Sequence, residues 1–213
     1  MSRLAELLRV AQALVFDFDG TLVDSNLIKQ RAFECCFSEF PHRLGEILAY
    51  CGRYHHTPRW EKFRHVYERI LGLPYTQAVE TALSKRFDAE TTHEIIHAAE
   101  VPGATAFLKS VRHRQVTALV SSTPHEVLLQ ILAARDWLDY FKYVQGAPVD
   151  KAAWLKEFRT KHGLNENGVV FFGDTQEDGE AALTAGCAFV GVGSEPLGVA
   201  TIASIPDFTV FIR

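Results

Sequence analysis

Two pairs of aspartates follow short apolar runs of the chain. Asp17 and Asp19 lie in the sequence DFDGT after the first run, and Asp174 and Asp178 lie in GDTQED after a later one. Carboxylates placed directly after a buried strand are costly unless a cation or a substrate interacts with them. Several of them at one site would repel each other, and a hard divalent cation with oxygen ligands relieves that repulsion. These residues therefore predict a Mg²⁺ site.

Groups that can bind an anion follow two other apolar runs. Ser121 and Ser122 come after the run 116–120 and before Pro124, where hydroxyls and the N–H groups of a helix start can hold an anion. Lys151 follows a weaker apolar run and adds a positive charge. Carboxylates, a hard metal, an anion-binding helix start and a lysine together predict phosphoryl transfer.

The apolar runs themselves predict the strands that position these groups. Runs of four or five apolar residues without alternation are typical of strands covered by helices on both faces. We expect strands at 13–16, 116–120, 140–144, 169–172 and 188–192, an edge strand at 208–212, and helices at 104–113, 124–134, 152–162 and 178–185. This alternation predicts an α/β fold with a doubly wound, Rossmann-like and mostly parallel sheet, which binds ligands beyond the carboxyl ends of its strands.

One long segment interrupts the alternation. No convincing strand is evident between the first and second runs, and aromatic and charged residues recur at helical spacing, as in WEKFRHVYERIL. Thr57 and Pro58 predict a helix N-cap followed by proline at the first helical position, and Gly72 predicts the end of that helix. We therefore expect an α/β core formed by residues 1–25 and 100–213, with an all-helical cap domain inserted at 26–99.

With these motifs, the chain resembles the haloacid dehalogenase (HAD) superfamily, and within it the phosphatases similar to phosphoglycolate phosphatase. Four motifs match in order: DFDGT at 17–21, Ser121 in VSSTP, Lys151 in GAPVDK, and GDTQED at 173–178. The helical insertion lies where such enzymes carry a small helical cap. The resemblance implies a Mg²⁺-dependent phosphatase acting on a small phosphorylated metabolite, such as a sugar phosphate, phosphoglycolate or a nucleoside monophosphate.

The resemblance also implies catalytic and metal-binding roles. Asp17 would be the nucleophile that forms an aspartyl-phosphate, and Asp19 the general acid that later acts as a base. The side chains of Asp17 and Asp174 and the backbone carbonyl of Asp19 would hold Mg²⁺. Asp178 would ligate the ion directly or through water, although an acid at this position can also serve only the start of a helix.

For the phosphoryl group, the resemblance points to a serine and a lysine. Ser121 and Lys151 would bind the phosphoryl oxygens. A shifted alignment would give the serine role to Ser122, and Lys142 or Lys156 could replace Lys151, because the residue after it is not the usual proline. The full expected phosphate-binding set is Gly20, Thr21, Ser121, Ser122 and Lys151.

Other activities are weighed against this interpretation. Asp19 disfavours the dehalogenases, which lack a second acid, and the phosphonate hydrolases, which use a lysine of the cap. A sugar phosphomutase similar to beta-phosphoglucomutase and a phospholigand-binding module without turnover remain alternatives. The sequence HEIIH at 93–97 matches zinc peptidases, but Gly103 stands where the extended motif has its third histidine, so we favour an ordinary helix.

The predicted cap carries a concentration of positive charge. Residues 52–69 include five basic and two acidic residues in a chain of net charge −4. Arg59 and Lys62 are three residues apart and therefore share a helix face. A cap over a phosphatase site contacts the part of the substrate that the core motifs do not, so we expect these two residues to select the substrate. The alternative is a solvated helix face.

Composition restricts the remaining classes. The chain has 213 residues, of which 47% are hydrophobic and 23% charged, as in an ordinary globular protein. Its negative net charge does not favour nucleic acid or an anionic membrane, and no apolar run approaches the ~18 residues of a membrane span. Glu6 and Arg9 interrupt what a signal peptide would need. We expect a cytoplasmic monomer or homodimer whose partner is a small metabolite.

Overall fold

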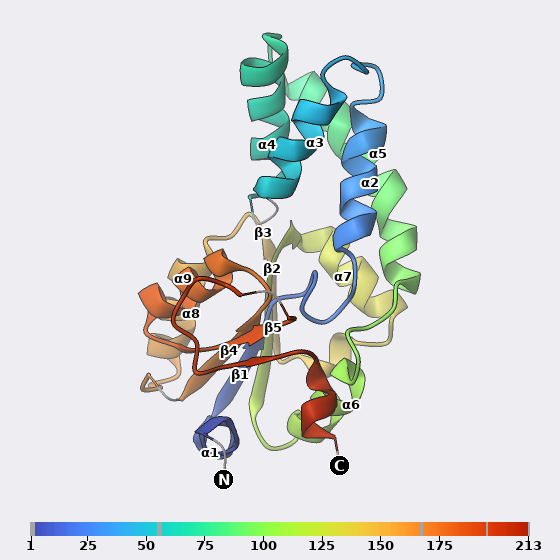
Figure 1. Cartoon of the computed structure of the whole chain (residues 1–213). Helices are drawn as coiled ribbons and strands as arrows, with labels where there is room; N and C mark the ends of the chain where they lie inside the picture. The colour runs from blue at the N-terminus through green and yellow to red at the C-terminus, as the bar shows by residue number, and fades with distance from the viewer. Residues whose placement is uncertain (1–2, 55–56, 167, 195, 213) are drawn as a thin grey trace. The chain divides into compact units, whose positions relative to one another are not determined.

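The computed structural model describes residues 3–54, 57–166, 168–194 and 196–212. The chain forms two compact units (Figure 1). The α/β unit comprises Met1–Asp24 and Ala99–Arg213, and the helical unit comprises Ser25–Ala98. Each boundary lies one residue from the boundary expected from the sequence.

A six-stranded parallel sheet, in the order β3-β2-β1-β4-β5-β6, forms the centre of the α/β unit. Its central strand β1 pairs with β2 on one side and β4 on the other, so the carboxyl ends of these three strands are neighbours. The strands β2 and β3 lie on one side of β1, and the later strands β4, β5 and β6 lie on the other. An open α/β sheet binds its ligand where the strand order reverses in this way. The strands are β1 (Ala13–Phe16), β2 (Val116–Pro124), β3 (Tyr143–Ala147), β4 (Val169–Gly173), β5 (Ala188–Val192) and β6 (Ala203–Ile205).

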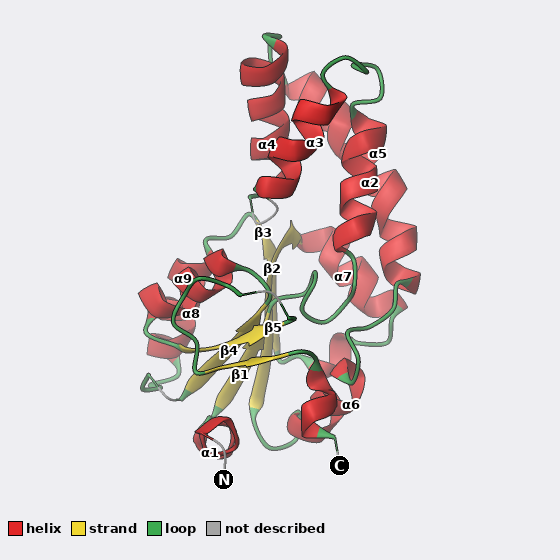
Figure 2. Ribbon diagram, in the orientation of Figure 1, coloured by secondary structure: helices red, strands yellow, loops and turns green. Residues whose placement is uncertain are grey.

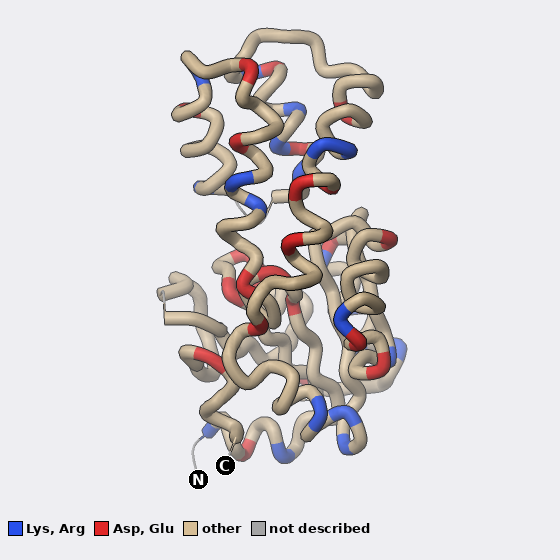
Figure 3. The backbone as a smooth tube through the Cα atoms, turned by 90° about the vertical axis from the view of Figure 1, so that its right-hand side faces the viewer, with Lys and Arg blue, Asp and Glu red and all other residues tan. Residues whose placement is uncertain are grey.

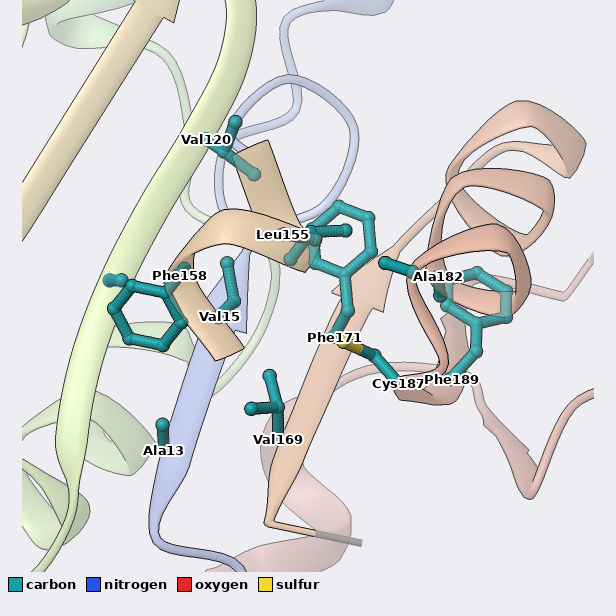
Figure 4. Close-up of a cluster of buried hydrophobic side chains, with 12 residues drawn as sticks. Ala13, Val15, Val120, Leu155, Phe158, Val169, Phe171, Ala182, Cys187 and Phe189 are labelled. Carbon is teal, nitrogen blue, oxygen red and sulfur yellow. The ribbon is translucent and has the colours of Figure 1, made fainter. Parts of the chain in front are cut away.

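Helices connect the strands and bury the sheet (Figure 2). On one face, side chains of α8 and α9 pack against alternate residues of the strands, such as Val15 and Phe171 (Figure 4). On the other face, Phe16 and Phe172 stack with ring centroids 5.0 Å apart, and Phe107 of α6 packs against both. The helices of this unit are α1 (Arg3–Val10), α6 (Ala104–Val111), α7 (His125–Ala134), α8 (Lys151–Lys161) and α9 (Gln176–Ala185).

Two predicted strands differ from the structure. Residues 208–212 do not form the edge strand, which is β6; Phe208–Phe211 instead forms a 3₁₀ helix, η3. The Asp207 carboxylate accepts a hydrogen bond from the Thr209 N–H at 2.8 Å, and Phe208 is fully buried against Phe107. The apolar character of this segment thus reflects aromatic packing. The third strand begins at Tyr143 because the 3₁₀ helix η2 (Leu138–Tyr140) occupies the expected start.

The helical unit has its own aromatic core. Phe33 packs against Phe63 and Phe87, with ring centroids 5.8 and 4.9 Å away, and Phe37 and Ile47 are fully buried beside them. Among its described residues no strand forms. Its elements are α2 (Asn26–Cys36), α3 (Leu44–Arg53), α4 (Arg59–His65), the π-helical segment η1 (Val66–Leu71) and α5 (Gln77–His97).

The ends of the α4–η1 helix differ in how well the sequence predicted them. Pro58, not Thr57, is the N-cap, because the ψ of Pro58 is 140° and the helix therefore begins at Arg59. Gly72 ends it as predicted, with a left-handed φ of 66° that favours glycine. None of the helices formed by the described residues has the length and apolar character needed to cross a membrane.

Candidate active site

The first pair of aspartates lies just beyond the end of β1. The Asp17 N–H donates to the Phe172 carbonyl at 2.9 Å, which extends the pairing with β4 by one residue. Phe18 is fully buried, whereas Asp19 is partly exposed. Gly20 has a φ of 76° and donates to the Val23 carbonyl at 2.8 Å, closing a tight turn. Gly20 therefore shapes the loop that presents both carboxylates.

The second pair is held by the junction between β4 and α9. Thr175 is the N-cap of α9 and forms a capping box with Asp178: its Oγ accepts from the Asp178 N–H at 3.1 Å, and its own N–H donates to Asp178 Oδ2 at 3.3 Å. A Cβ added to Gly173 would lie only 2.5 Å from the Asp178 Cβ, so the lack of a side chain at Gly173 lets Asp178 approach β4. Asp178 thus helps to cap α9 through Oδ2, and its other carboxylate oxygen lies near Asp17.

Three of these carboxylates converge. Oxygen atoms of Asp17, Asp174 and Asp178 all lie within 4.8 Å of one another. Figure 3 shows acidic residues gathered at one end of the α/β unit. The Thr21 hydroxyl donates to Asp174 Oδ1 at 3.0 Å and is fully buried. The Thr21 hydroxyl thus orients a carboxylate of the acidic group, and the expected binding of phosphate by Gly20 and Thr21 stays a prediction.

Lys151 is the cation that the fold brings to this group. It is the first residue of α8, and its Nζ lies 2.9 Å from Asp17 Oδ1 and 2.7 Å from Asp178 Oδ1. The other two candidates lie elsewhere: Lys142 precedes the amino end of β3, and Lys156 is exposed on α8. Of the three lysines considered, Lys151 is therefore the one that lies at the acidic group.

The electrostatics of this cluster follow from its burial. Burial raises the pKa of Asp17; Lys151 opposes that rise, and the nearby carboxylates of Asp178, Asp174 and Asp19 add to it. Burial opposes the charge of Lys151, but Asp17 and Asp178 outweigh it and raise the pKa of the lysine. Lys151 therefore stays charged, and further positive charge beside it would favour the ionised form of Asp17.

The acidic group fits a hard divalent cation. It offers carboxylate oxygens from three side chains, and one lysine does not balance their charge. Asp17 Oδ1 is buried and accepts no well-formed hydrogen bond from the described residues, although Lys151 is paired with it. All-oxygen ligation of this kind suits Mg²⁺. Asp17, Asp174 and Asp178 could therefore hold the ion through their side chains.

The predicted serines lie where β2 leaves its regular pairing with β3. The register shifts between Val120, which pairs with Gln145, and Pro124, which pairs with Ala147, so extra residues bulge out of β2. Ser121 lies in the bulge and is fully buried; its Oγ accepts from the Thr123 N–H at 3.1 Å. Ser122 is partly exposed at the same bulge. Both therefore precede the start of α7, as the sequence predicted.

Two threonines beside these carboxylates were not predicted from the sequence. Thr123 donates from its hydroxyl to Asp19 Oδ2 at 2.7 Å. Thr175 donates from its hydroxyl to Asp178 Oδ2 at 2.6 Å. The spacing of Thr175 and Asp178 is that of a capping box and could have been recognised, whereas nothing local indicates that Thr123 meets a residue 104 positions away.

The two predicted cap residues contact the helical unit itself. Arg59 binds the carboxylate of Asp88 on α5 through both terminal nitrogens, at 2.5 and 3.0 Å. Lys62 is only 4% exposed; its Nζ donates to the Cys51 carbonyl at 3.3 Å and lies 5.0 Å from the centre of the Phe33 ring. Burial lowers the pKa of Lys62 to about 8. Both residues therefore interact within the helical unit, and their expected contact with substrate stays a prediction.

The HEIIH sequence lies on α5, as an ordinary helix would have it. His93 and His97 are exposed, with ring centroids 4.7 Å apart, and Ile95 is buried. Glu94, which would be the general base of a peptidase, pairs with Arg31 at 3.0 Å. This arrangement fits a helix with one buried apolar face.

The family model described as haloacid dehalogenase-like hydrolase matches residues 14–192, so the chain belongs to this family of enzymes. No curated protein matches the sequence significantly.

Solved structures with the same fold include three proteins described as a phosphatase, a hydrolase and a mutase. A predicted phosphoglycolate phosphatase from Haemophilus somnus is 20% identical, with a TM-score of 0.74, and the match covers 94% of this chain and 96% of that one. A haloacid dehalogenase-like hydrolase from Bacteroides fragilis is 19% identical, with a TM-score of 0.75 and coverage of 95% and 100%. A beta-phosphoglucomutase from Clostridium difficile is 15% identical, with a TM-score of 0.75 and coverage of 94% and 92%.

Proposed function

We propose that this protein is a Mg²⁺-dependent phosphatase that hydrolyses a small phosphorylated metabolite through an aspartyl-phosphate. The observation that carries the proposal is the position of Asp17. This carboxylate is buried just beyond the end of the central strand and contacts Lys151, next to Asp174 and Asp178. A nucleophilic carboxylate, a fixed cation and a hard-metal site are what phosphoryl transfer to an enzyme group requires.

The proposed reaction has two steps. An Asp17 oxygen attacks phosphorus, and the bond from phosphorus to the leaving oxygen breaks while Asp19 donates a proton to that oxygen. Asp19 then accepts a proton from water, which attacks phosphorus and breaks the bond to Asp17, releasing phosphate. Ser121 and Lys151 bind the phosphoryl oxygens in both steps. Mg²⁺ held by Asp17, Asp174 and Asp178, with the Asp19 carbonyl, supplies charge neutralisation when bound.

The proposed substrate is a sugar phosphate, phosphoglycolate or a nucleoside monophosphate. A sugar phosphomutase is the second candidate, because beta-phosphoglucomutases are among the proteins of the same fold. The mutase would interconvert isomers of one sugar phosphate and release little phosphate. A protein that only binds a phosphorylated ligand would release none. We further propose that the enzyme acts in the cytoplasm as a monomer or homodimer, without nucleic acid or membrane.

The test is phosphate release from a panel of phosphorylated metabolites. We expect turnover with Mg²⁺, its loss in EDTA, and inhibition by Ca²⁺, which accepts more ligands and would engage both oxygens of Asp17. Asp17→Asn should fold but lose turnover, because an amide is a very poor nucleophile. Asp139→Asn, at an exposed aspartate of the same unit, is the control. Full activity in EDTA, or more than a few per cent of wild-type kcat in Asp17→Asn, would contradict the proposal.

A further inference from the structure

The carboxylate of Asp19 is held by a side chain from another strand. The Thr123 hydroxyl donates to Asp19 Oδ2 at 2.7 Å, and Thr123 is only 6% exposed. The torsion that rotates an aspartate carboxyl group has broad minima, so a partner is needed to hold one orientation. Asp19 is itself partly exposed, and its carboxylate is therefore not confined by packing alone. The contact fixes one oxygen of Asp19 against β2.

The backbone around Thr123 is built to place this hydroxyl. Thr123 lies in the bulge of β2, and bulges near active sites re-aim side chains. Its N–H donates to Ser121 Oγ at 3.1 Å, which ties it to a phosphate-binding residue of the proposed site. A hydroxyl can also stay bonded to a carboxyl group in both protonation states, because it can donate or accept.

A glycine of the neighbouring strand allows the bulge to lie close. A Cβ added to Gly146 of β3 would lie 2.6 Å from the Thr123 carbonyl oxygen and 2.5 Å from the Cα of His125. The Gly146 N–H donates to His125 Nδ1 at 3.1 Å, which fastens the start of α7 to β3. The segment that carries Thr123 is therefore held on both sides of that residue.

We propose that Thr123 is a positioning residue that orients Asp19 for proton transfer to the leaving oxygen and from water. The inference rests on the proposed phosphatase function. Thr123 acts through Asp19 and need not touch the reacting atoms. Its loss should therefore slow only those reactions in which the leaving group requires a proton, because misorientation of a catalytic group lowers the rate of the step it serves.

The experiment compares Thr123→Val, which removes the hydroxyl at nearly constant volume, with Thr123→Ser, which keeps it. Thr117→Val is the matched control: Thr117 is a buried threonine of the same strand whose hydroxyl donates to the Tyr140 carbonyl. For each protein, kcat and KM are measured with an alkyl phosphate and with p-nitrophenyl phosphate, whose leaving group needs little protonation. Thermal unfolding reports folding, and Thr123→Ala replaces Thr123→Val if the valine variant does not fold.

We expect Thr123→Val to lower kcat for the alkyl phosphate by about 10- to 100-fold and for p-nitrophenyl phosphate by less than about threefold. KM should stay near the wild-type value. Thr123→Ser and Thr117→Val should keep the wild-type ratio of the two kcat values. Equal losses on both substrates, or no loss on either, would overturn the positioning role while leaving the phosphatase proposal intact. A wild-type protein that releases phosphate from neither substrate would overturn the proposed function, and the role of Thr123 with it.

Discussion

Replacing Lys151 with methionine should destabilise the metal-free protein strongly. The lysine Nζ lies 2.9 Å from Asp17 and 2.7 Å from Asp178, and its side chain is 16% exposed. Lys151→Met leaves these two buried carboxylates near Asp174 without that cation. Removing one partner of a buried ion pair costs about 3–5 kcal/mol. Asp17 can take up a proton in response, so we expect the lower end, about 3 kcal/mol. For a chain of this length that corresponds to a fall in Tm of about 6–12 °C.

The assay is thermal unfolding in EDTA and in Mg²⁺, with Lys156→Met as the control, since Lys156 is exposed on the same helix. The cost should shrink as the pH falls from about 9 to about 7, because burial raises the pKa of Asp17 to about 8. Burial and like charges raise the pKa of Asp17, so protonation of the native state relieves the repulsion as the pH falls. Mg²⁺ at 100 times its Kd adds about 2.7 kcal/mol to a protein that binds it only when folded. Equal Tm values for Lys151→Met and Lys156→Met in EDTA would refute this reasoning.

Two further predictions concern the helical unit. Lys62→Met should be more stable than wild type at pH 7 by about 1–3 kcal/mol, because burial lowers the pKa of Lys62 to about 8 and the native protein carries a disfavoured charge. That advantage should shrink between pH 8 and about 10 in urea unfolding, as the native lysine loses its proton; a constant advantage would show that the charge is not the cause. Arg59→Gln breaks the pair with Asp88 and should cost about 1–3 kcal/mol, while changing kcat/KM equally for metabolite and p-nitrophenyl phosphate. A loss confined to the metabolite would instead support substrate contact by Arg59.

The strands next to the acidic group, and the acids that follow them, were predictable from local sequence. Apolar runs such as 13–16 and 169–172 favour buried strands whatever the rest of the fold. Asp17 and Asp174 lie at the ends of these strands because they follow them in the sequence. The carboxyl ends of parallel strands lie at the same edge of a sheet, so the convergence of these acids follows from the fold class. The same local signals predicted Gly72 as a helix end. The edge strand expected at 208–212 was wrong, since an apolar run cannot distinguish a strand from aromatic packing by η3.

Which distant groups meet depends on how the elements pack in three dimensions. The packing placed Lys151 between Asp17 and Asp178, whereas the sequence offered three lysines as candidates for the lysine of the phosphate site. It brought Thr123 to Asp19 across 104 residues, and it buried Lys62, which the charge pattern had assigned to a ligand. The physical reason is that periodicity and capping depend on neighbours along the chain, whereas ion pairs, hydroxyl contacts and the burial of a long side chain depend on how separate elements pack.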